Sequence, residues 1–273
     1  MRIPIRTSKW ATAARRFAGI ALPLVVVPIF FHRAGAMPTM AFELVAAAGT
    51  LLGALAILSA LVAFVRLWIT GDKGWGRAVT GFVFGVLCVL PAGALAADFL
   101  RYPLADDVTT SPLDPPPLLS GVAAPPDPAA AARLAALFPN LQPRNYPLDP
   151  ATVFGIVAGI VRDDGWQVVR ENPPDDNGQG GQINALAMTL FGFREEVSIR
   201  LAPTAAGTAV DVRSVALTPL HEPGANGTRV TAFLADLDNR ITAAQQRPAS
   251  ADTGDEAAPA PLPAPPPART GKR

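Results

Sequence analysis

Three long apolar segments near the N-terminus constrain this chain more than any other feature of its sequence. The segments are residues 17–31, 44–68 and 78–97, and apolar or small side chains fill most of each one. A helix of roughly 20 apolar residues is long enough to cross the hydrocarbon core of a bilayer. The second and third segments meet this length, so we predict that they are transmembrane helices.

The first segment is shorter and contains Pro23 and Pro28, which leaves two interpretations open. It is either a short transmembrane helix or the apolar part of a signal peptide, since Ala34-Gly35-Ala36 has the small-x-small form of a cleavage site. We favour the helix because two further spans follow directly.

Particular side chains within the segments fit a membrane location. Arg66 and Trp68 close the second segment as an interfacial anchor, and Glu43 lies at its other boundary, where the carboxylate can reach lipid head groups. Gly81 and Gly85 in the third segment form a G-x-x-x-G spacing that allows a neighbouring helix to approach. The lipid bilayer is therefore the first predicted partner of the chain.

The distribution of basic residues predicts how the helices are oriented, because cytoplasmic loops carry an excess of Lys and Arg. The loop between the first two spans holds only Arg33. The other two regions hold more, namely Arg2, Arg6, Lys9, Arg15 and Arg16 before the first span and Arg66, Lys73 and Arg77 around the loop after the second. The N-terminus is therefore predicted to be cytoplasmic, and three crossings place everything after Ala97 outside.

Composition indicates a bacterial source and argues against several kinds of site. Lysine occurs only three times whereas Ala, Pro, Gly and Arg are abundant, a bias typical of GC-rich bacterial genomes. We therefore expect the inner membrane and, after Ala97, the periplasm. The net charge of +1 argues against nucleic acid as a partner. The single cysteine, Cys88, allows no intramolecular disulfide and no Cys-based metal site, and we predict no cofactor.

Changes in composition divide the chain into four regions. Residues 1–97 form the three-helix transmembrane region, and residues 98–127 form a proline-rich linker in which proline disfavours both helix and sheet. Residues 128–246 form a small α+β domain. Residues 247–273 are rich in Ala and Pro and are predicted to be a disordered tail.

Within the domain, hydrophobic periodicity predicts an antiparallel sheet with helices on one face. Asp149-Pro150 has the pattern of an N-cap followed by a first-turn proline, as does Asp127-Pro128, and Gly165 is a natural helix stop. The predicted helices are residues 129–137, the segment from 150 to 164, and 227–241. The predicted strands are residues 166–170, 183–193, 196–202 and 209–217, of which the second is apolar on both faces and is expected to be central.

The last two strands form the strongest local pattern, because apolar and polar side chains alternate in both. A short turn at residues 204–207 joins them as a hairpin. Placing the apolar side chains of both strands inward sets Arg200 opposite Asp211 and Ser198 opposite Arg213. Opposite charges that face each other across a hairpin contribute roughly 0.2–1 kcal/mol.

Several parts of this region together resemble the domain-of-unknown-function family 1499. The resemblance is carried by residues 195–200, Gly207, residues 210–214 and 224–226, with Asp107-Val108-Thr109-Thr110 as the first segment. It extends from residue 107 to residue 237, and it implies a membrane-associated bacterial protein with no established reaction. Residues 215–223 depart from the polar, Arg- and Gly-rich segment usual in the family, so any role of that segment is in doubt here.

Arg200, Asp211, Arg213 and Asn226 are the candidate binding residues. Arginines on a strand can bind a carboxylate or phosphate through two hydrogen bonds, which fits a small anionic ligand or another envelope protein as partner. The alternative is that these side chains form a structural ladder of ion pairs that fixes the hairpin.

Other possible sites have weaker patterns. Ser214, His221 and Asp211 lack the surroundings of a hydrolase nucleophile, and Asp211 and Ser214 alternate to opposite faces. His221 and Glu222 have no third metal ligand at suitable spacing. The glycines at residues 178–181 do not match a phosphate-binding loop, and we assign Trp166 to core packing. We predict neither catalytic nor metal-binding residues.

The sequence therefore favours a non-enzymatic membrane protein that presents a periplasmic binding module. A membrane-bound enzyme, such as a hydrolase, is the alternative. In a third hypothesis the membrane helices act and the domain serves as their sensor. The near-absence of charged residues within the spans argues against a transporter.

Overall fold

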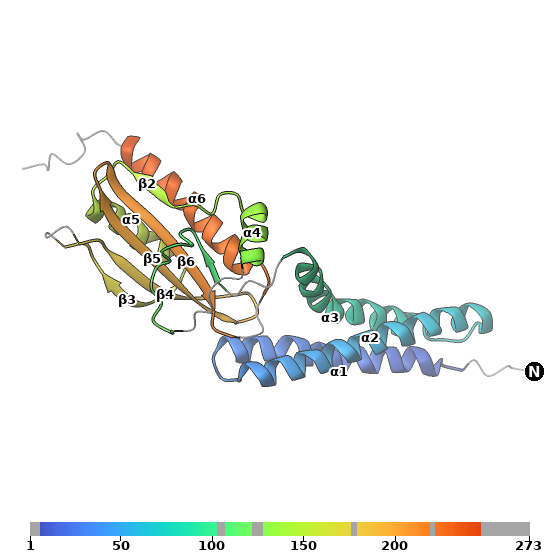
Figure 1. Cartoon of the computed structure of the whole chain (residues 1–273). Helices are drawn as coiled ribbons and strands as arrows, with labels where there is room; N and C mark the ends of the chain where they lie inside the picture. Colours follow the sequence, from blue (N-terminus) through green and yellow to red (C-terminus); the bar gives the residue numbers. More distant parts are fainter. Residues whose placement is uncertain (1–5, 103–106, 122–127, 176–178, 219–221, 247–273) are drawn as a thin grey trace, which may run out of the picture.

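The computed structural model describes residues 6–102, 107–121, 128–175, 179–218 and 222–246. These residues form a bundle of three long helices and a mixed domain at one end of it (Figure 1). The predicted tail, Asp127 and His221 lie outside the described residues.

The bundle consists of α1 (Lys9–Arg33), α2 (Thr39–Thr70) and α3 (Trp75–Arg101). Each helix is long and apolar enough to cross a membrane, which confirms three candidate spans. α1 begins well before the predicted apolar run, with the Ser8 side chain accepting a hydrogen bond from the Ala11 amide as its N-cap. Many large apolar side chains on the outside of the bundle are exposed, as expected of helices that face lipid.

Small residues bring the three helices close together. Gly81 lies against Ala14 of α1, where a Cβ atom would be only 2.6 Å from the Ala14 carbonyl carbon. Gly85, one turn later, lies against Gly53 of α2, where a Cβ atom would be 2.8 Å from the carbonyl oxygen. The two glycines of the G-x-x-x-G spacing therefore have different neighbours: Gly81 lets α3 approach α1, and Gly85 lets α3 approach α2.

The two ends of the bundle have different neighbours. At one end Thr7 forms a β-bridge with Lys73, next to the turn between α2 and α3. At the other end lie the loop between α1 and α2, the C-terminus of α3 and the mixed domain (Figure 1). The start of α1 and the domain are therefore at opposite ends of the bundle, as expected if each of the three helices crosses a membrane.

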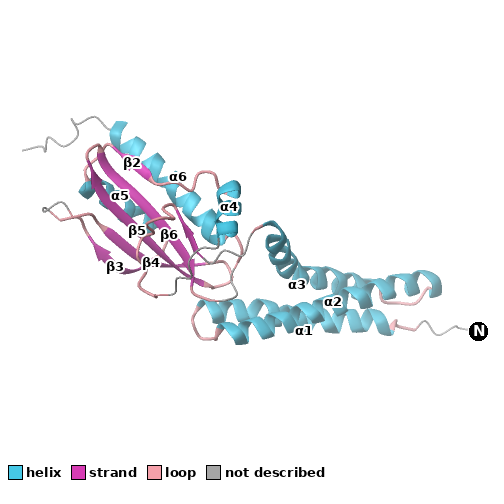
Figure 2. Ribbon diagram, viewed as in Figure 1, coloured by secondary structure: helices cyan, strands magenta, loops and turns pink. Residues whose placement is uncertain are grey.

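A six-stranded antiparallel sheet forms the centre of the domain (Figure 2). Its order is β1-β6-β5-β4-β3, and β2 also pairs with β6. The strands are β1 (Asp107–Thr109), β2 (Arg144–Tyr146), β3 (Gln167–Asn172), β4 (Gln182–Met188), β5 (Arg194–Thr204) and β6 (Gly207–Ala216).

The predicted hairpin is confirmed in its register. In β5 and β6, Arg200 faces Asp211 and Ser198 faces Arg213. The central position of β4 is also confirmed, since it lies between β3 and β5.

Two predictions about where helices and strands lie are wrong. The second predicted strand ends at Met188 rather than at residue 193, because the chain turns at Gly192 (φ +94°) and the Thr189 amide donates to the Phe193 carbonyl. The proline-rich linker, residues 98–127, is predicted to contain neither helix nor sheet, yet the last turn of α3 and the whole of β1 lie within it. β1 occupies a stretch without proline, so its amides remain available for pairing with β6.

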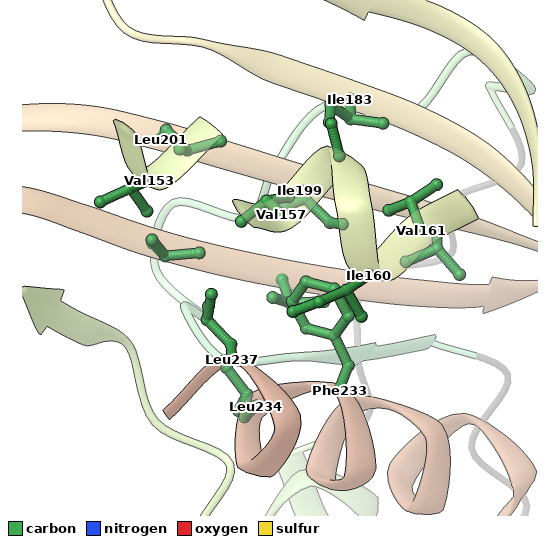
Figure 3. Packing of buried hydrophobic residues seen from close by; sticks show 14 of the residues in the cluster. Val153, Val157, Ile160, Val161, Ile183, Ile199, Leu201, Phe233, Leu234 and Leu237 are labelled. Atoms are coloured by element: carbon green, nitrogen blue, oxygen red, sulfur yellow. The ribbon is translucent and has the colours of Figure 1, made fainter. Parts of the chain in front are cut away.

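The helices of the domain are α4 (Pro128–Leu137), α5 (Pro150–Asp163) and α6 (Ala225–Gln246). Asp149 caps α5 by accepting a hydrogen bond from the Thr152 amide, and Gly165 follows its end with a φ of +69°. α5 and α6 pack their apolar sides on one face of the sheet (Figure 3). The core includes Val153, Val157, Ile160, Ile183, Ile199, Leu201, Phe233, Leu234 and Leu237, all at most 1% exposed.

We predict that Gly81→Ala destabilises the bundle by about 1–3 kcal/mol, because the added methyl group overlaps the backbone of α1. Gly93→Ala on the same helix is the matched control, since nothing lies within 4 Å of its Cβ position; it should be neutral or stabilising by up to about 1 kcal/mol. The measurement is unfolding of the full-length protein in detergent. Equal effects of the two substitutions would contradict this packing.

Candidate functional site

The face of the sheet opposite the helices is polar. Strand alternation places on it Gln182, Asn184, Glu196, Ser198, Arg200, Asp211 and Arg213. Residues 111–120, which we name the proline strap, cross this face after β1 and make hydrogen bonds with most of these side chains. Asn184, Glu196 and Ser198 are at most 3% exposed, so the strap covers a face that water would otherwise reach.

The carbonyl oxygen of Pro117 is the central acceptor of the strap. It accepts hydrogen bonds from Gln182 Nε2 at 3.2 Å, Asn184 Nδ2 at 3.1 Å and Ser198 Oγ at 2.8 Å. Three side chains from β4 and β5 thus converge on one backbone atom, which fixes the height of the strap above the sheet.

Glu196 binds the strap further along. Its two carboxylate oxygens accept from the amides of Leu119 at 2.6 Å and Ser120 at 3.0 Å, and Asn184 donates to the same group. Burial alone would raise the pKa of Glu196, but these hydrogen bonds outweigh burial and hold the pKa of the carboxyl below its ordinary value. Glu196 is therefore ionised at neutral pH and anchors the strap.

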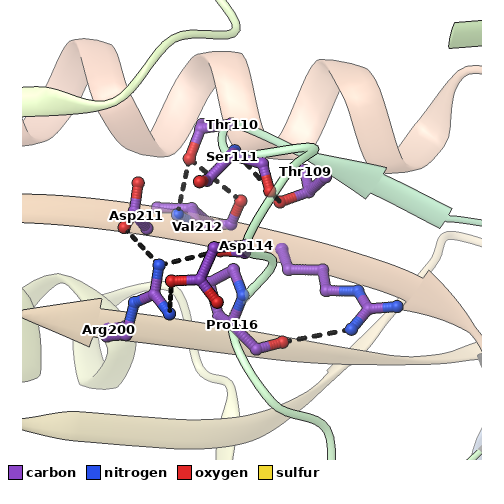
Figure 4. A network of polar contacts seen from close by, with 9 residues as sticks. Thr109, Thr110, Ser111, Asp114, Pro116, Arg200, Asp211 and Val212 are labelled. Carbon is purple, nitrogen blue, oxygen red and sulfur yellow. Dashed lines mark hydrogen bonds and ion pairs between the residues drawn. The ribbon is translucent and has the colours of Figure 1, made fainter.

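Arg200 lies between a carboxylate of the sheet and one of the strap (Figure 4). Its Nη2 is 2.8 Å from Asp211 Oδ2, and its Nη1 is 2.9 Å from Asp114 Oδ2. The two carboxylates differ in exposure, because the Asp211 side chain is 12% exposed and that of Asp114 is 80% exposed. The guanidinium thus pairs with a largely buried carboxylate on the sheet, Asp211, and with a solvent-exposed carboxylate on the strap, Asp114.

Arg213 has a more enclosed environment. It donates from Nε and Nη2 to the two oxygens of Asp107 on β1 and from Nη1 to the Pro116 carbonyl. The side chains of both ion-pair partners are less than 10% exposed. This pair joins β1, β6 and the strap.

Asn226 is not part of this polar face. It lies at the start of α6, on the helix side of the sheet, where its Oδ1 accepts from Ser214 Oγ at 2.7 Å. The structure therefore brings together three of the four predicted binding residues, Arg200, Asp211 and Arg213, and separates the fourth.

The weaker candidates are dispersed. Ser214 and Asp211 point to opposite faces of β6, and Glu222 Oε1 accepts from the Phe191 amide at 3.4 Å. Within the described ranges, no group of three or more His, Cys, Asp or Glu residues is placed to hold a metal ion. Trp166 stacks on Phe233 at the edge of the core, which confirms its packing role.

A buried ion pair lies on the face of the sheet that the helices cover, and the sequence did not predict it. Glu195 is fully buried and pairs with Arg229 of α6, and burial lowers the pKa of Arg229 to about 10. A signal was present, because adjacent acids at the start of an alternating strand must point to opposite faces. One of Glu195 and Glu196 therefore had to lie on the covered side and to need a cation there.

Polar contacts also join the bundle to the domain. His32 Nδ1 lies 2.8 Å from the Phe191 carbonyl oxygen, and Arg33 Nη1 donates to the carbonyl oxygens of Thr189 and Leu190 at 2.8 Å. The His32 ring also stacks on Phe42, with 4.5 Å between the ring centroids. The end of α1 thus binds the backbone of the loop between β4 and β5.

Comparison with known proteins identifies one family. Residues 107–237 match the model of a family described as protein of unknown function (DUF1499). The match begins at β1 and includes all six strands, the strap and most of α6. No match was found among curated proteins, and none among solved structures.

We predict that Glu196→Gln lowers stability at neutral pH by about 1–3 kcal/mol, because hydrogen bonds to a charged acceptor become bonds to a neutral one. The contribution of the carboxylate is complete above its unfolded pKa of about 4.3 and is lost as the pH falls through the lower folded pKa. The difference between wild type and variant should therefore shrink between pH 7 and pH 3.

The measurement is thermal unfolding of the full-length protein in detergent at both pH values. Asp163→Asn is the control, because Asp163 is an exposed carboxylate in an ion pair with Arg240 and should change stability by about 1 kcal/mol or less. A constant difference between wild type and Glu196→Gln across this pH range would show that the charged anchor is unimportant.

Proposed function

The domain at residues 107–237 belongs to the DUF1499 family of proteins of unknown function, and we propose that the chain is a bacterial inner-membrane protein that presents this domain to the periplasm to bind an anionic partner. The partner is another envelope protein or a small ligand that offers a carboxylate or phosphate. The observation that carries the proposal is the outward-facing pair of Arg200 and Asp114.

Two observations support the orientation. The basic residues of the bundle are concentrated near the N-terminus and around the turn between α2 and α3, which favours a cytoplasmic location for that end. The domain is attached at the opposite end. Arg33, the last residue of α1, lies at the domain end of the bundle and donates to backbone carbonyls of the domain.

Arg200 is held in a fixed direction without being buried. Its side chain is 25% exposed, and Asp211 holds it from the sheet. Its outer partner, Asp114, accepts a hydrogen bond from Nη2 at its backbone carbonyl, and its carboxylate forms the kind of exposed ion pair that contributes only about 0–1 kcal/mol. A carboxylate or phosphate of a partner can therefore replace the Asp114 carboxylate at little cost, while Asp211 and the Asp114 backbone carbonyl keep the guanidinium oriented.

The other predicted binding residues fit structural roles. Arg213 and Asp107 are both enclosed, so replacing either partner would leave the other charge buried and unpaired rather than open a site. Asn226 positions Ser214 on the far side of the sheet. We therefore assign partner binding to Arg200 with Asp211. The separation of Ser214 from Asp211 favours a binding module over a hydrolase built on those residues.

The orientation predicts the behaviour of a reporter fusion. A reporter enzyme that is active only outside the cytoplasm, fused after Gln246, should be active, and the same reporter fused within the turn at Asp72 should be inactive. Activity of both fusions is to be measured at matched expression. A stable but inactive fusion after Gln246 would overturn the proposed topology.

The binding role predicts opposite effects of two substitutions. A photo-crosslinking residue at position 113, where Leu113 is fully exposed next to Asp114, should give an adduct of discrete mass in intact cells. Arg200→Gln should reduce this adduct by roughly tenfold or more, since it removes a charge-assisted hydrogen bond. Asp114→Asn should increase the yield of the adduct, because it removes the carboxylate that competes with the partner for Arg200.

Arg240→Gln is the matched control, since Arg240 forms ion pairs with two carboxylates on the helix side of the domain. It should leave the adduct unchanged. A wild-type adduct that is insensitive to Arg200→Gln would refute the role of Arg200, and a decrease with Asp114→Asn would show that the strap carboxylate itself contacts the partner.

A further inference from the structure

A cavity of about 520 Å³ lies where the bundle meets the domain. Its walls come from α1, α2 and α3, and Phe191 and Phe193 of the β4–β5 loop close it on the domain side. The volume is within the range of about 300–1,000 Å³ typical of sites for small molecules. Apolar side chains form most of the lining, and Glu43 is the one charged residue among the described residues that line it.

The position of the cavity along α2 indicates what surrounds it. α2 has 32 residues and is therefore ~48 Å long, whereas the hydrocarbon core is about 30 Å thick. The ends of α2 must project into the head-group layers. Glu43 lies one turn from the start of the helix, while Thr50 and Ala54 of the same cavity lie two to three turns deeper. The cavity thus runs from the head-group layer into the hydrocarbon.

An acyl chain of a lipid suits the apolar part of this cavity. Such a chain gains little free energy from moving there, because the lipid surroundings are as apolar as the protein. Selectivity must therefore come from the head group. The chemistry at the level of the head groups then decides which lipid is retained.

Glu43 supplies that chemistry. Among the residues that the structure describes, no hydrogen bond or ion pair reaches its carboxylate. Arg33, a basic residue at the same end of the bundle, donates to the carbonyls of Thr189 and Leu190 instead. A half-buried carboxylate without an internal cation favours a ligand that brings a positive charge and hydrogen-bond donors.

We propose that the cavity binds one acyl chain of a phospholipid whose head group carries a primary ammonium, and that Glu43 binds the ammonium. Such a lipid contacts both parts of the protein, because Phe42 and Phe193 line the cavity and also pack against each other and against His32. The bound lipid therefore completes the contact between bundle and domain. This site is separate from the partner site at Arg200.

The test compares two lipids on the full-length protein in detergent. After delipidation, phosphatidylethanolamine or phosphatidylglycerol is added at equal concentrations, and the bound fraction is measured by native mass spectrometry. Wild type should retain phosphatidylethanolamine roughly tenfold more than phosphatidylglycerol, the ratio expected for one charge-assisted hydrogen bond. Glu43→Gln should abolish the preference, and Ala46→Phe, which fills the cavity, should abolish retention of both lipids.

Matched controls separate binding from misfolding. Ala48→Phe places the same side chain on an exposed position of α2 outside the cavity, and Asp72→Asn removes a carboxylate at the opposite end of the bundle. Both should bind as wild type does. Equal retention of the two lipids by wild type, retention of neither, or an unchanged preference in Glu43→Gln would each overturn the proposal.

Discussion

The domain depends on how the polar face of its sheet is covered. Proline has no amide hydrogen, so residues 115–117 of the strap offer carbonyl oxygens and no backbone donors. The sheet beneath them supplies the missing donors from Asn184, Ser198 and Arg213. Where the proline run ends, the strap regains amides at Leu119 and Ser120, and there the sheet supplies an acceptor, Glu196. The sheet therefore offers donors under the proline run, where the strap has only acceptors, and an acceptor where the strap has amides.

The same coverage explains how the membrane helices and the domain form one unit. The chain leaves α3, passes through β1 and then crosses the sheet as the strap, so the segment that connects the two parts is also part of the fold. A second contact also joins the two parts, since His32 and Arg33 hydrogen-bond to the backbone of residues 189–191.

Local patterns in the sequence were enough to predict the helices and the hairpin of β5 and β6, because side chains within a few positions of each other decide them. β1 and β2 have three residues each and are too short to show alternation, and they exist only because β6 pairs with them. The sequence also could not predict which of the candidate arginines is exposed and which is enclosed. Arg200 and Arg213 alternate alike in their strands, and only the distant residues Asp114 and Asp107 make one exposed and the other enclosed.

The pairing of β1 with β6 affects the order in which the strands of the sheet can pair during synthesis. β1 pairs with β6 across the interval from residue 107 to residue 215. At a synthesis rate of about 5–20 residues per second, β1 leaves the ribosome on the order of 5–20 s before its partner. β1 and the strap must therefore remain without their pairing partners in the sheet until β6 has been synthesised. The loop between β1 and β6 is long, so closing it carries an entropic cost that the contacts of the completed sheet must offset.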